Sequence, residues 1–208
     1  MNKDYEDKLF DEVHKIIVGI DEVGRGPFFG DVLACAIAFE KDFFMEEVND
    51  SKKLSQKKRE KIFKELVKNA IGIGIGKASP EEIDKINIKE ATHLAMQRAV
   101  EDFHDDMNNK LTPDIILIDA EKIDVDVEQR AIVHGDATVF TIAAASIVAK
   151  VLRDADITYL AQKYPEYDLE NNKGYGTKKH REAILKYGPT PLHRKTFLRK
   201  LLGNGDAK

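Results

Sequence analysis

The chain has 208 residues, 42% of them hydrophobic and 34% charged, with a formal net charge of −4 and a single cysteine, Cys35. This length and composition fit one globular domain with a real core, and the lone cysteine excludes an internal disulfide. The sequence has no apolar stretch long enough to cross a membrane and its charged start is unlike a secretory signal, so we expect a cytoplasmic protein.

Apolar runs and turn signals predict the elements of the first half. Residues 15–21 and 31–40 are short apolar runs around a glycine-rich turn, which predicts a β-hairpin. Residues 52–69 form a basic amphipathic helix with Ser55 as its N-cap. Residues 70–79 alternate Ile with Gly. The glycine spacing does not match a dinucleotide-binding loop, so we expect a strand packed closely on its glycine face.

The second half alternates strands and helices. A capping box of Ser79, Pro80 and Glu82 predicts the start of a helix. The further predicted elements are a buried strand over 114–120, a short strand or loop over 131–138, and a long helix over 141–164. This order predicts an α/β or α+β class with a mixed sheet. We expect one domain over 1–208, with a basic, helical C-terminal part from about residue 155.

Basic residues gather in two segments although the net charge is negative. Residues 49–69 carry eight Lys or Arg against three acids, and residues 172–200 carry nine against one. A polyanion responds to local potential more than to total charge, so both segments are candidate nucleic-acid surfaces. Two solvated helix faces would give the same pattern, and charge alone does not separate these interpretations.

Four acids lie at predicted strand ends or loops: Asp21, Glu22, Asp119 and Asp136. Neighbouring strands are about 5 Å apart, so acids at one end of a sheet can converge. Converging carboxylates repel one another unless a cation lies among them, and all-oxygen ligands suit Mg²⁺ or Mn²⁺. Two such cations about 4 Å apart would suit phosphodiester hydrolysis. The alternative is that each acid merely caps a helix or turn.

Asp21 and Glu22 raise a geometric difficulty. Adjacent residues of a regular strand point to opposite faces, so both cannot reach one metal from ideal β geometry. We therefore expect the strand to end or bulge at this pair, before the turn that follows it.

Two glycine-rich turns are candidate ligand contacts. Gly24 and Gly26 allow a close backbone approach, which could read a 2′-hydroxyl, while Arg25 between them could hold a phosphate. Tyr175 lies between glycines in a basic segment and could stack on a base or sugar. A tight turn with a solvated arginine, and a tyrosine that covers a loop, are the alternatives.

These motifs resemble, in order and spacing, those of bacterial ribonuclease HII. The segments that carry the resemblance are "GIDEVGRGPFFGDVLACAIAF", "NDSKKLS", "INIKEATHLAMQRAV", "ILIDA", "HGDATVFTIAAASIVAKVLRD", "NKGYGTKKH" and "HRKTF". The resemblance covers nearly the whole chain. It implies an RNase H-like fold with a mixed five-stranded sheet flanked by helices and a C-terminal helical extension. It also implies Mg²⁺- or Mn²⁺-dependent cleavage of RNA in RNA/DNA hybrids, and incision 5′ to a single ribonucleotide in duplex DNA.

The resemblance also implies residue roles. Asp21, Glu22, Asp119 and Asp136 would be the catalytic, metal-binding acids. The other implied contacts are with nucleic acid: Gly24, Arg25 and Gly26 at the 2′-hydroxyl, Tyr175 at the ribose-to-deoxyribose junction, and Lys52 and Lys53 at the backbone. The expected partners are hybrids and ribonucleotide-containing DNA, bound by a monomer with no membrane or protein partner. Asp31, Ala120 and Thr196 depart from the usual family residues, and we expect activity to be intact.

Three other functions compete with this interpretation. Ribonuclease HIII acts on hybrids but is poor at single ribonucleotides; it lacks the arginine-centred GRG turn and usually has an extra N-terminal domain. A non-catalytic nucleic-acid-binding protein of the same fold would not need all four acids. A metal hydrolase of small phosphoesters would leave the two basic segments unexplained.

Overall fold

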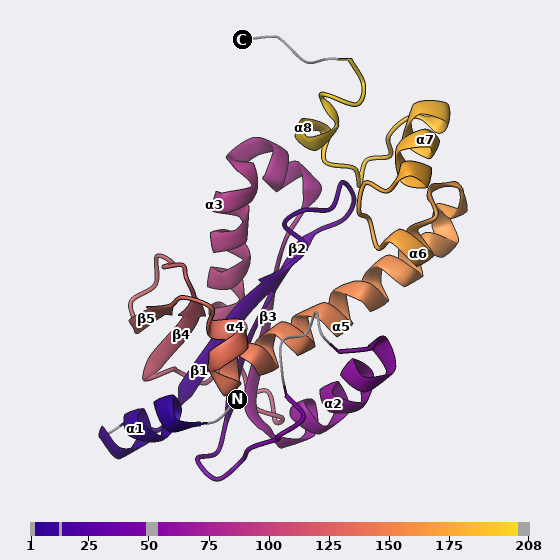
Figure 1. Ribbon diagram of the computed structural model, residues 1–208. Helices are drawn as coiled ribbons and strands as arrows, with labels where there is room; N and C mark the ends of the chain where they lie inside the picture. The colour runs from indigo at the N-terminus through magenta and orange to yellow at the C-terminus, as the bar shows by residue number, and fades with distance from the viewer. Residues whose placement is uncertain (1–2, 13, 49–53, 204–208) are drawn as a thin grey trace.

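A computed structural model describes residues 3–12, 14–48 and 54–203 (Figure 1). Its described strands form one sheet in the order β3-β2-β1-β4-β5. The strands are β1 (Ile17–Val23), β2 (Val32–Phe39), β3 (Ala70–Ala78), β4 (Ile115–Asp119) and β5 (Glu128–Ile132). β2 pairs antiparallel with both β1 and β3, whereas β4 pairs parallel with both β1 and β5. The predicted hairpin and mixed five-stranded sheet are confirmed.

Helices flank this sheet, and further helices form a C-terminal part beyond it (Figure 1). They are α1 (Asp4–Glu12), α2 (Gln56–Asn69), α3 (Pro80–Glu101), α4 (Gly135–Thr138), α5 (Phe140–Lys163), α6 (Leu169–Asn172), α7 (Lys178–Tyr187) and α8 (Lys195–Leu198), with a short 3-10 helix over Pro165–Tyr167. In the ranges that the structure describes, none of them has the length and apolarity needed to cross a membrane.

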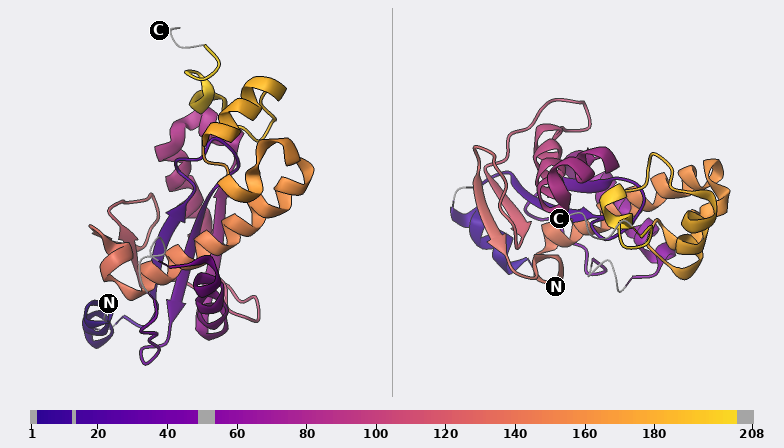
Figure 2. Two further views of the ribbon diagram at one scale, coloured as in Figure 1. Left: turned by 45° about the vertical axis from the view of Figure 1, so that its right-hand side comes forward. Right: turned by 90° about the horizontal axis from the view of Figure 1, so that it is seen from above.

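The two faces of the sheet pack against different helices, as two views show (Figures 1 and 2). Every residue of β2 is buried. Val32 and Ala34 pack with α3 on one face, while Leu33 and Cys35 pack with α2 and α5 on the other. A strand covered on both faces reads as a continuous apolar run, which is the pattern of this segment. Cys35 is a core residue, as predicted.

Local signals placed the starts of two helices correctly. The Ser55 hydroxyl accepts from the Lys58 N–H at 3.4 Å. The Ser79 hydroxyl accepts from the Glu82 N–H at 3.2 Å, and the Glu82 carboxylate accepts from the Ser79 N–H at 2.8 Å. Both N-caps and the capping box are therefore confirmed.

The glycine face of β3 lies directly against α3. A Cβ atom added to Gly76 would lie only 1.9 Å from the Ala95 carbonyl oxygen, and one on Gly74 would lie 2.0 Å from that of Ala99. The alternating glycines thus serve helix packing, and the predicted close approach is confirmed.

α5 leads from the sheet into the C-terminal helices (Figure 1). There Ile157 of α5 packs in a second core with Phe29, Tyr167, Ile184 and Leu198. Since α5 contributes to this core and to the one beneath β2, we propose that sheet and C-terminal helices form the one predicted domain.

Candidate active site

The four predicted acids lie in one pocket at the end of the sheet. Its volume is about 320 Å³, and the residues that line it are Asp21, Glu22, Val23, Arg59, Asp119, Asp136, Ser146, Lys150 and Tyr175. These residues come from β1, α2, β4, α4, α5 and the loop before α7. Sequence positions from 21 to 175 therefore converge on one site.

The prediction that β1 ends or bulges at its acids is wrong. Asp21 pairs with Cys35 and Glu22 with Ala34 in an unbroken register. The reason both acids can reach the pocket lies in the neighbouring strand. The paired residues of β1 and β4 stop at Ile20, so the edge of β1 beyond that residue is open. The pocket, which both acids line, therefore lies at a part of β1 that no residue of β4 pairs with.

Asp119 and Asp136 are positioned together. Asp119 is the last residue of β4, as predicted, and its Oδ1 accepts from the Gly135 N–H at 2.8 Å. Asp136 follows Gly135 within the short helix α4, rather than at a strand end or in a loop. Asp119 therefore holds the turn that carries Asp136.

Asp21 is the most perturbed acid of the site. Its side chain is buried, with 7% exposed. Burial raises the pKa of Asp21 well above its usual value, and the charges of Glu22 and Asp119 raise it further, while a hydrogen bond from Ser146 opposes them. This environment disfavours an isolated negative charge and favours a cation beside it.

The chemistry of these side chains fits a hard divalent cation, because every acidic donor is a carboxylate oxygen. Among the described residues, however, no three His, Cys, Asp or Glu side chains form a group that could hold a metal ion. Glu22 instead binds Arg25, with Oε1 at 3.2 Å from Nη1. A cation that took Glu22 Oε1 as a ligand would compete with Arg25 for that oxygen.

The turn over residues 24–26 lies beside this pocket. Gly24 has φ +95°, and a Cβ atom there would lie 2.3 Å from Nε of Arg153, so glycine is needed for two reasons. The Arg25 guanidinium is not simply solvated, because Nη1 also lies 3.6 Å from Oε1 of Glu121. It lies between two acids at the rim of the site.

Gly26 and Tyr175 face each other. A Cβ atom on Gly26 would have Tyr175 Cε1 as its nearest neighbour, at an ordinary contact distance of 3.7 Å. The Tyr175 side chain is 43% exposed. The two glycine-rich turns predicted to contact a ligand are thus adjacent, with an accessible aromatic ring between them.

A pair of buried histidines supports the Tyr175 loop. The Thr190 N–H donates to His193 Nδ1 at 3.0 Å, so His193 carries its proton on Nε2. His193 Nε2 lies 3.1 Å from His180 Nε2, and His180 Nδ1 lies 2.9 Å from the Tyr175 carbonyl oxygen. With both rings neutral, His193 donates to His180 and His180 donates to Tyr175. Protonating either ring would break this chain of hydrogen bonds.

These histidines predict a loss of stability in mild acid. Burial, with a contribution from His180, lowers the pKa of His193 to about 4 from 6.5. Between these values the unfolded chain binds a proton that the folded chain does not. The free energy of unfolding should therefore fall by roughly 3 kcal/mol as the pH drops from 6.5 to about 4.

Urea unfolding at pH 7 and pH 5 measures this decrease, with His193→Gln as the comparison. The variant should show a shallower pH dependence; equal slopes would contradict the assignment.

Comparisons with known proteins agree with this geometry. The family model described as Ribonuclease HII matches residues 18–200. A Ribonuclease HII from Alkaliphilus oremlandii is 50% identical over 199 residues, which is 96% of this chain and 98% of that protein. The chain belongs to the ribonuclease HII family. It is accordingly a ribonuclease H enzyme, which rules against a non-catalytic binding protein and a hydrolase of small phosphoesters.

Solved structures confirm the fold. The crystal structure of ribonuclease H2 from Pyrococcus horikoshii OT3 superimposes with a TM-score of 0.74 at 25% identity, covering 91% of this chain and 98% of that one. Bst-RNase HIII in complex with Mn²⁺ superimposes with a TM-score of 0.67, covering 94% of this chain and 71% of that one. At 15% identity this second likeness shows the fold alone, so the family match favours ribonuclease HII over ribonuclease HIII.

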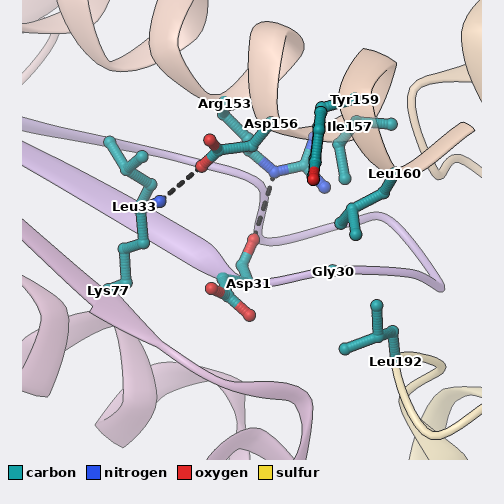
Figure 3. Close-up of a pocket in the computed structure, with 10 residues that line it drawn as sticks. All are labelled: Gly30, Asp31, Leu33, Lys77, Arg153, Asp156, Ile157, Tyr159, Leu160 and Leu192. Atoms are coloured by element: carbon teal, nitrogen blue, oxygen red, sulfur yellow. Dashed lines mark hydrogen bonds and ion pairs between the residues drawn. The ribbon is translucent and has the colours of Figure 1, made fainter. Parts of the chain in front are cut away.

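The three departures from the ribonuclease HII pattern have separate explanations. Asp31 lines a different cavity of about 250 Å³, beside Lys77 and Asp156, which form an ion pair there (Figure 3). Ala120 has φ +52°, a left-handed conformation that glycine adopts more easily than alanine. Thr196 keeps the hydroxyl of serine and donates it to Asp84 Oδ1 at 2.5 Å.

Sequence reasoning missed three polar residues that line the pocket, Arg59, Ser146 and Lys150. Ser146 and Lys150 are four residues apart in α5, so a helical pattern already predicts that they lie on the same face of the helix. Lys150 also pairs with Asp154 at 2.8 Å. Arg59 belongs to a basic segment that was recognised only as a whole. Lys52 and Lys53, the predicted backbone contacts, lie outside the described residues.

Proposed function

We propose that this enzyme hydrolyses the RNA strand of RNA/DNA hybrids and cuts 5′ to single ribonucleotides embedded in duplex DNA, leaving 3′-hydroxyl and 5′-phosphate ends. The observation that carries the proposal is the convergence of four carboxylates with Tyr175 in one pocket, beside the GRG turn. Membership of the ribonuclease HII family supports the same reaction.

We further propose that Asp21, Glu22, Asp119 and Asp136 are catalytic and hold Mg²⁺ or Mn²⁺. Divalent cations would supply the positive charge that activates water and stabilises the leaving oxygen in phosphodiester hydrolysis. The carboxylate ligands and the raised pKa of Asp21 support this assignment. The Mn²⁺ complex of Bst-RNase HIII is consistent with it, although that protein is only a distant relative.

Substrate contacts follow from what surrounds the acids. Arg59 and Lys150 line the pocket and carry the charge needed to bind phosphates. Gly24, Arg25 and Gly26 would bring the backbone close to the 2′-hydroxyl, and Arg25 would exchange its acidic partners for a phosphate. Tyr175, accessible and beside Gly26, would stack at the ribose-to-deoxyribose junction.

Metal removal tests the proposed reaction. Purified protein is incubated with an end-labelled RNA/DNA hybrid in Mg²⁺ or in Mn²⁺, with chelator and with an all-DNA duplex as controls. We expect cleavage of the RNA strand that stops on chelation and returns when metal is added back. Cleavage that persists after complete chelation would contradict the metal assignment.

Tyr175→Ala tests the junction role. Because a single ribonucleotide offers one junction whereas a long hybrid offers many equivalent riboses, the variant should lose more activity on the former. We expect a loss of about tenfold or more in kcat/KM on single-ribonucleotide duplexes, as for removal of one stacking contact, and a smaller loss on hybrids. Equal losses on both substrates would count against this role.

A further inference from the structure

A buried arginine, Arg194, donates hydrogen bonds to backbone carbonyls of the GRG turn. Arg194 has no exposed surface. Its Nη2 donates to the Gly24 carbonyl oxygen at 2.6 Å, and its Nη1 donates to that of Arg25 at 2.9 Å. Nε and Nη2 both donate to the carbonyl oxygen of Gly30, at 3.0 and 2.8 Å. Within the described residues, no carboxylate accepts a hydrogen bond from this guanidinium.

A buried guanidinium bound only to carbonyls is an expensive way to hold a turn. Desolvation of a cation is unfavourable, and burial together with the nearby charge of Arg153 lowers the pKa of Arg194 to about 9. An apolar side chain could fill the same volume without that penalty. The arrangement therefore suggests a role for the charge beyond packing.

Two of the three bound carbonyls belong to peptide groups that the proposed recognition uses. The Gly24 carbonyl shares its peptide with the Arg25 N–H, and the Arg25 carbonyl shares its peptide with the Gly26 N–H. A cationic donor on a carbonyl polarises the whole peptide and makes its N–H a stronger donor. Neither of these two N–H groups donates to another described group. Pro27, which follows, has no N–H to offer.

The segment around Arg194 is itself fixed. Asp84 of α3 accepts from the N–H of Lys195 at 2.8 Å and from that of Thr196 at 2.9 Å. The Arg194 N–H donates to the Phe28 carbonyl at 2.9 Å, and the Phe197 ring centroid lies 5.3 Å from the guanidinium carbon. The guanidinium is thus held in place before any ligand arrives.

We propose that Arg194 is a positioning residue for recognition of the 2′-hydroxyl, because it fixes and polarises the two peptides whose N–H groups, of Arg25 and Gly26, would bind the ribose. This inference rests on the proposed function and adds a residue to it. Arg194 lies behind the turn and does not touch the substrate.

Arg194→Lys tests the proposal, since lysine keeps the charge but lacks the planar fork of N–H donors with which Arg194 spans the carbonyls of Gly24, Arg25 and Gly30. The kcat and KM for a single-ribonucleotide duplex are measured in Mg²⁺, together with the inhibition constant of an all-DNA competitor. We expect kcat/KM to fall by about tenfold or more, since charged hydrogen bonds that orient the site are lost. The inhibition constant should stay within about twofold, because phosphate contacts are unchanged.

Leu198→Ala is the matched control. Leu198 is buried in the same segment but makes no contact to the turn through hydrogen bonds. It should lower the melting temperature while leaving kcat/KM of the folded protein within about twofold. An equal loss of kcat/KM in both variants, or a parallel loss of competitor binding in Arg194→Lys, would overturn the proposal.

Two further results keep the test decisive. If Arg194→Lys does not fold, Phe197→Leu replaces it, because this substitution removes the ring beside the guanidinium. It should lower kcat/KM for the single-ribonucleotide duplex by less than Arg194→Lys would, and leave the inhibition constant of the all-DNA competitor unchanged. A kcat/KM equal to that of the unaltered protein would overturn the proposal. If the unaltered protein does not cut the single-ribonucleotide duplex, the proposed function fails. If the unaltered protein cuts it and Arg194→Lys has the same kcat/KM, only the role of Arg194 fails.

Discussion

Asp21→Asn is expected to abolish cleavage while largely sparing substrate binding. The substitution keeps the shape of the side chain but removes its negative charge. Asp21 is the acid of the site whose pKa is raised most, by burial and by the charges of Glu22 and Asp119. A loss of about a thousandfold or more in kcat is expected for such a residue. Gel-shift titration with a single-ribonucleotide duplex measures binding beside the cleavage rate.

Removing this charge should not destabilise the fold. A carboxylate whose pKa is raised by burial and by neighbouring acids is a group that the folded state disfavours in its charged form. At pH 7 the variant should be as stable as the unaltered protein or more stable. Asp31→Asn is the matched control, because Asp31 lines the other cavity, and it should retain full activity. Retained turnover in Asp21→Asn would contradict the catalytic assignment.

Gly19→Ala is expected to have the largest effect on folding. A Cβ atom on Gly19 would lie 2.2 Å from the carbonyl carbon and 2.4 Å from the carbonyl oxygen of Thr141. These are backbone atoms of α5, so no side-chain rotation relieves the clash, and α5 would have to move away from β1. We expect the free energy of unfolding to fall by about 3–5 kcal/mol, a large part of the usual total for a domain.

A contact with α1 limits how far α5 can move. The buried carboxylate of Glu6 accepts from the Thr141 N–H at 3.0 Å, so α1 is attached at the same point. Urea unfolding of Gly19→Ala measures the loss. Gly26→Ala serves as the control, since its Cβ atom would meet nothing closer than 3.7 Å. A change below about 1 kcal/mol in Gly19→Ala would show that the close packing of α5 on β1 is not needed.

Features set by neighbouring residues could be predicted from the sequence. The strands of the hairpin, the glycine face of β3 and the capping box at Ser79 each depend on a pattern within about ten residues. Family motifs extended this to the whole sheet and to the choice of the four acids. These motifs named Asp119 and Asp136, but not the hydrogen bond from Gly135 that links them.

Features set by distant partners could not be predicted. Asp21 and Glu22 stay in a regular strand because they pair with Cys35 and Ala34 of β2. The edge of β1 beside them is open because its pairing with β4 stops at Ile20, and β4 lies about a hundred residues later in the sequence. Arg194 binds carbonyls 164 to 170 positions earlier in the chain. An arginine in a basic segment reads as surface charge, and only the fold shows that this one is buried.

The most direct test of the proposed function is the position of a single cut. A DNA duplex with one ribonucleotide, labelled at the 5′ end of that strand, is incubated with the protein in Mg²⁺ or Mn²⁺ and resolved at single-nucleotide resolution. We predict one metal-dependent product that ends in a 3′-hydroxyl immediately 5′ to the ribonucleotide, with no cut in an all-DNA duplex. Cleavage of long hybrids without cleavage at the single ribonucleotide would contradict the proposed incision at single ribonucleotides.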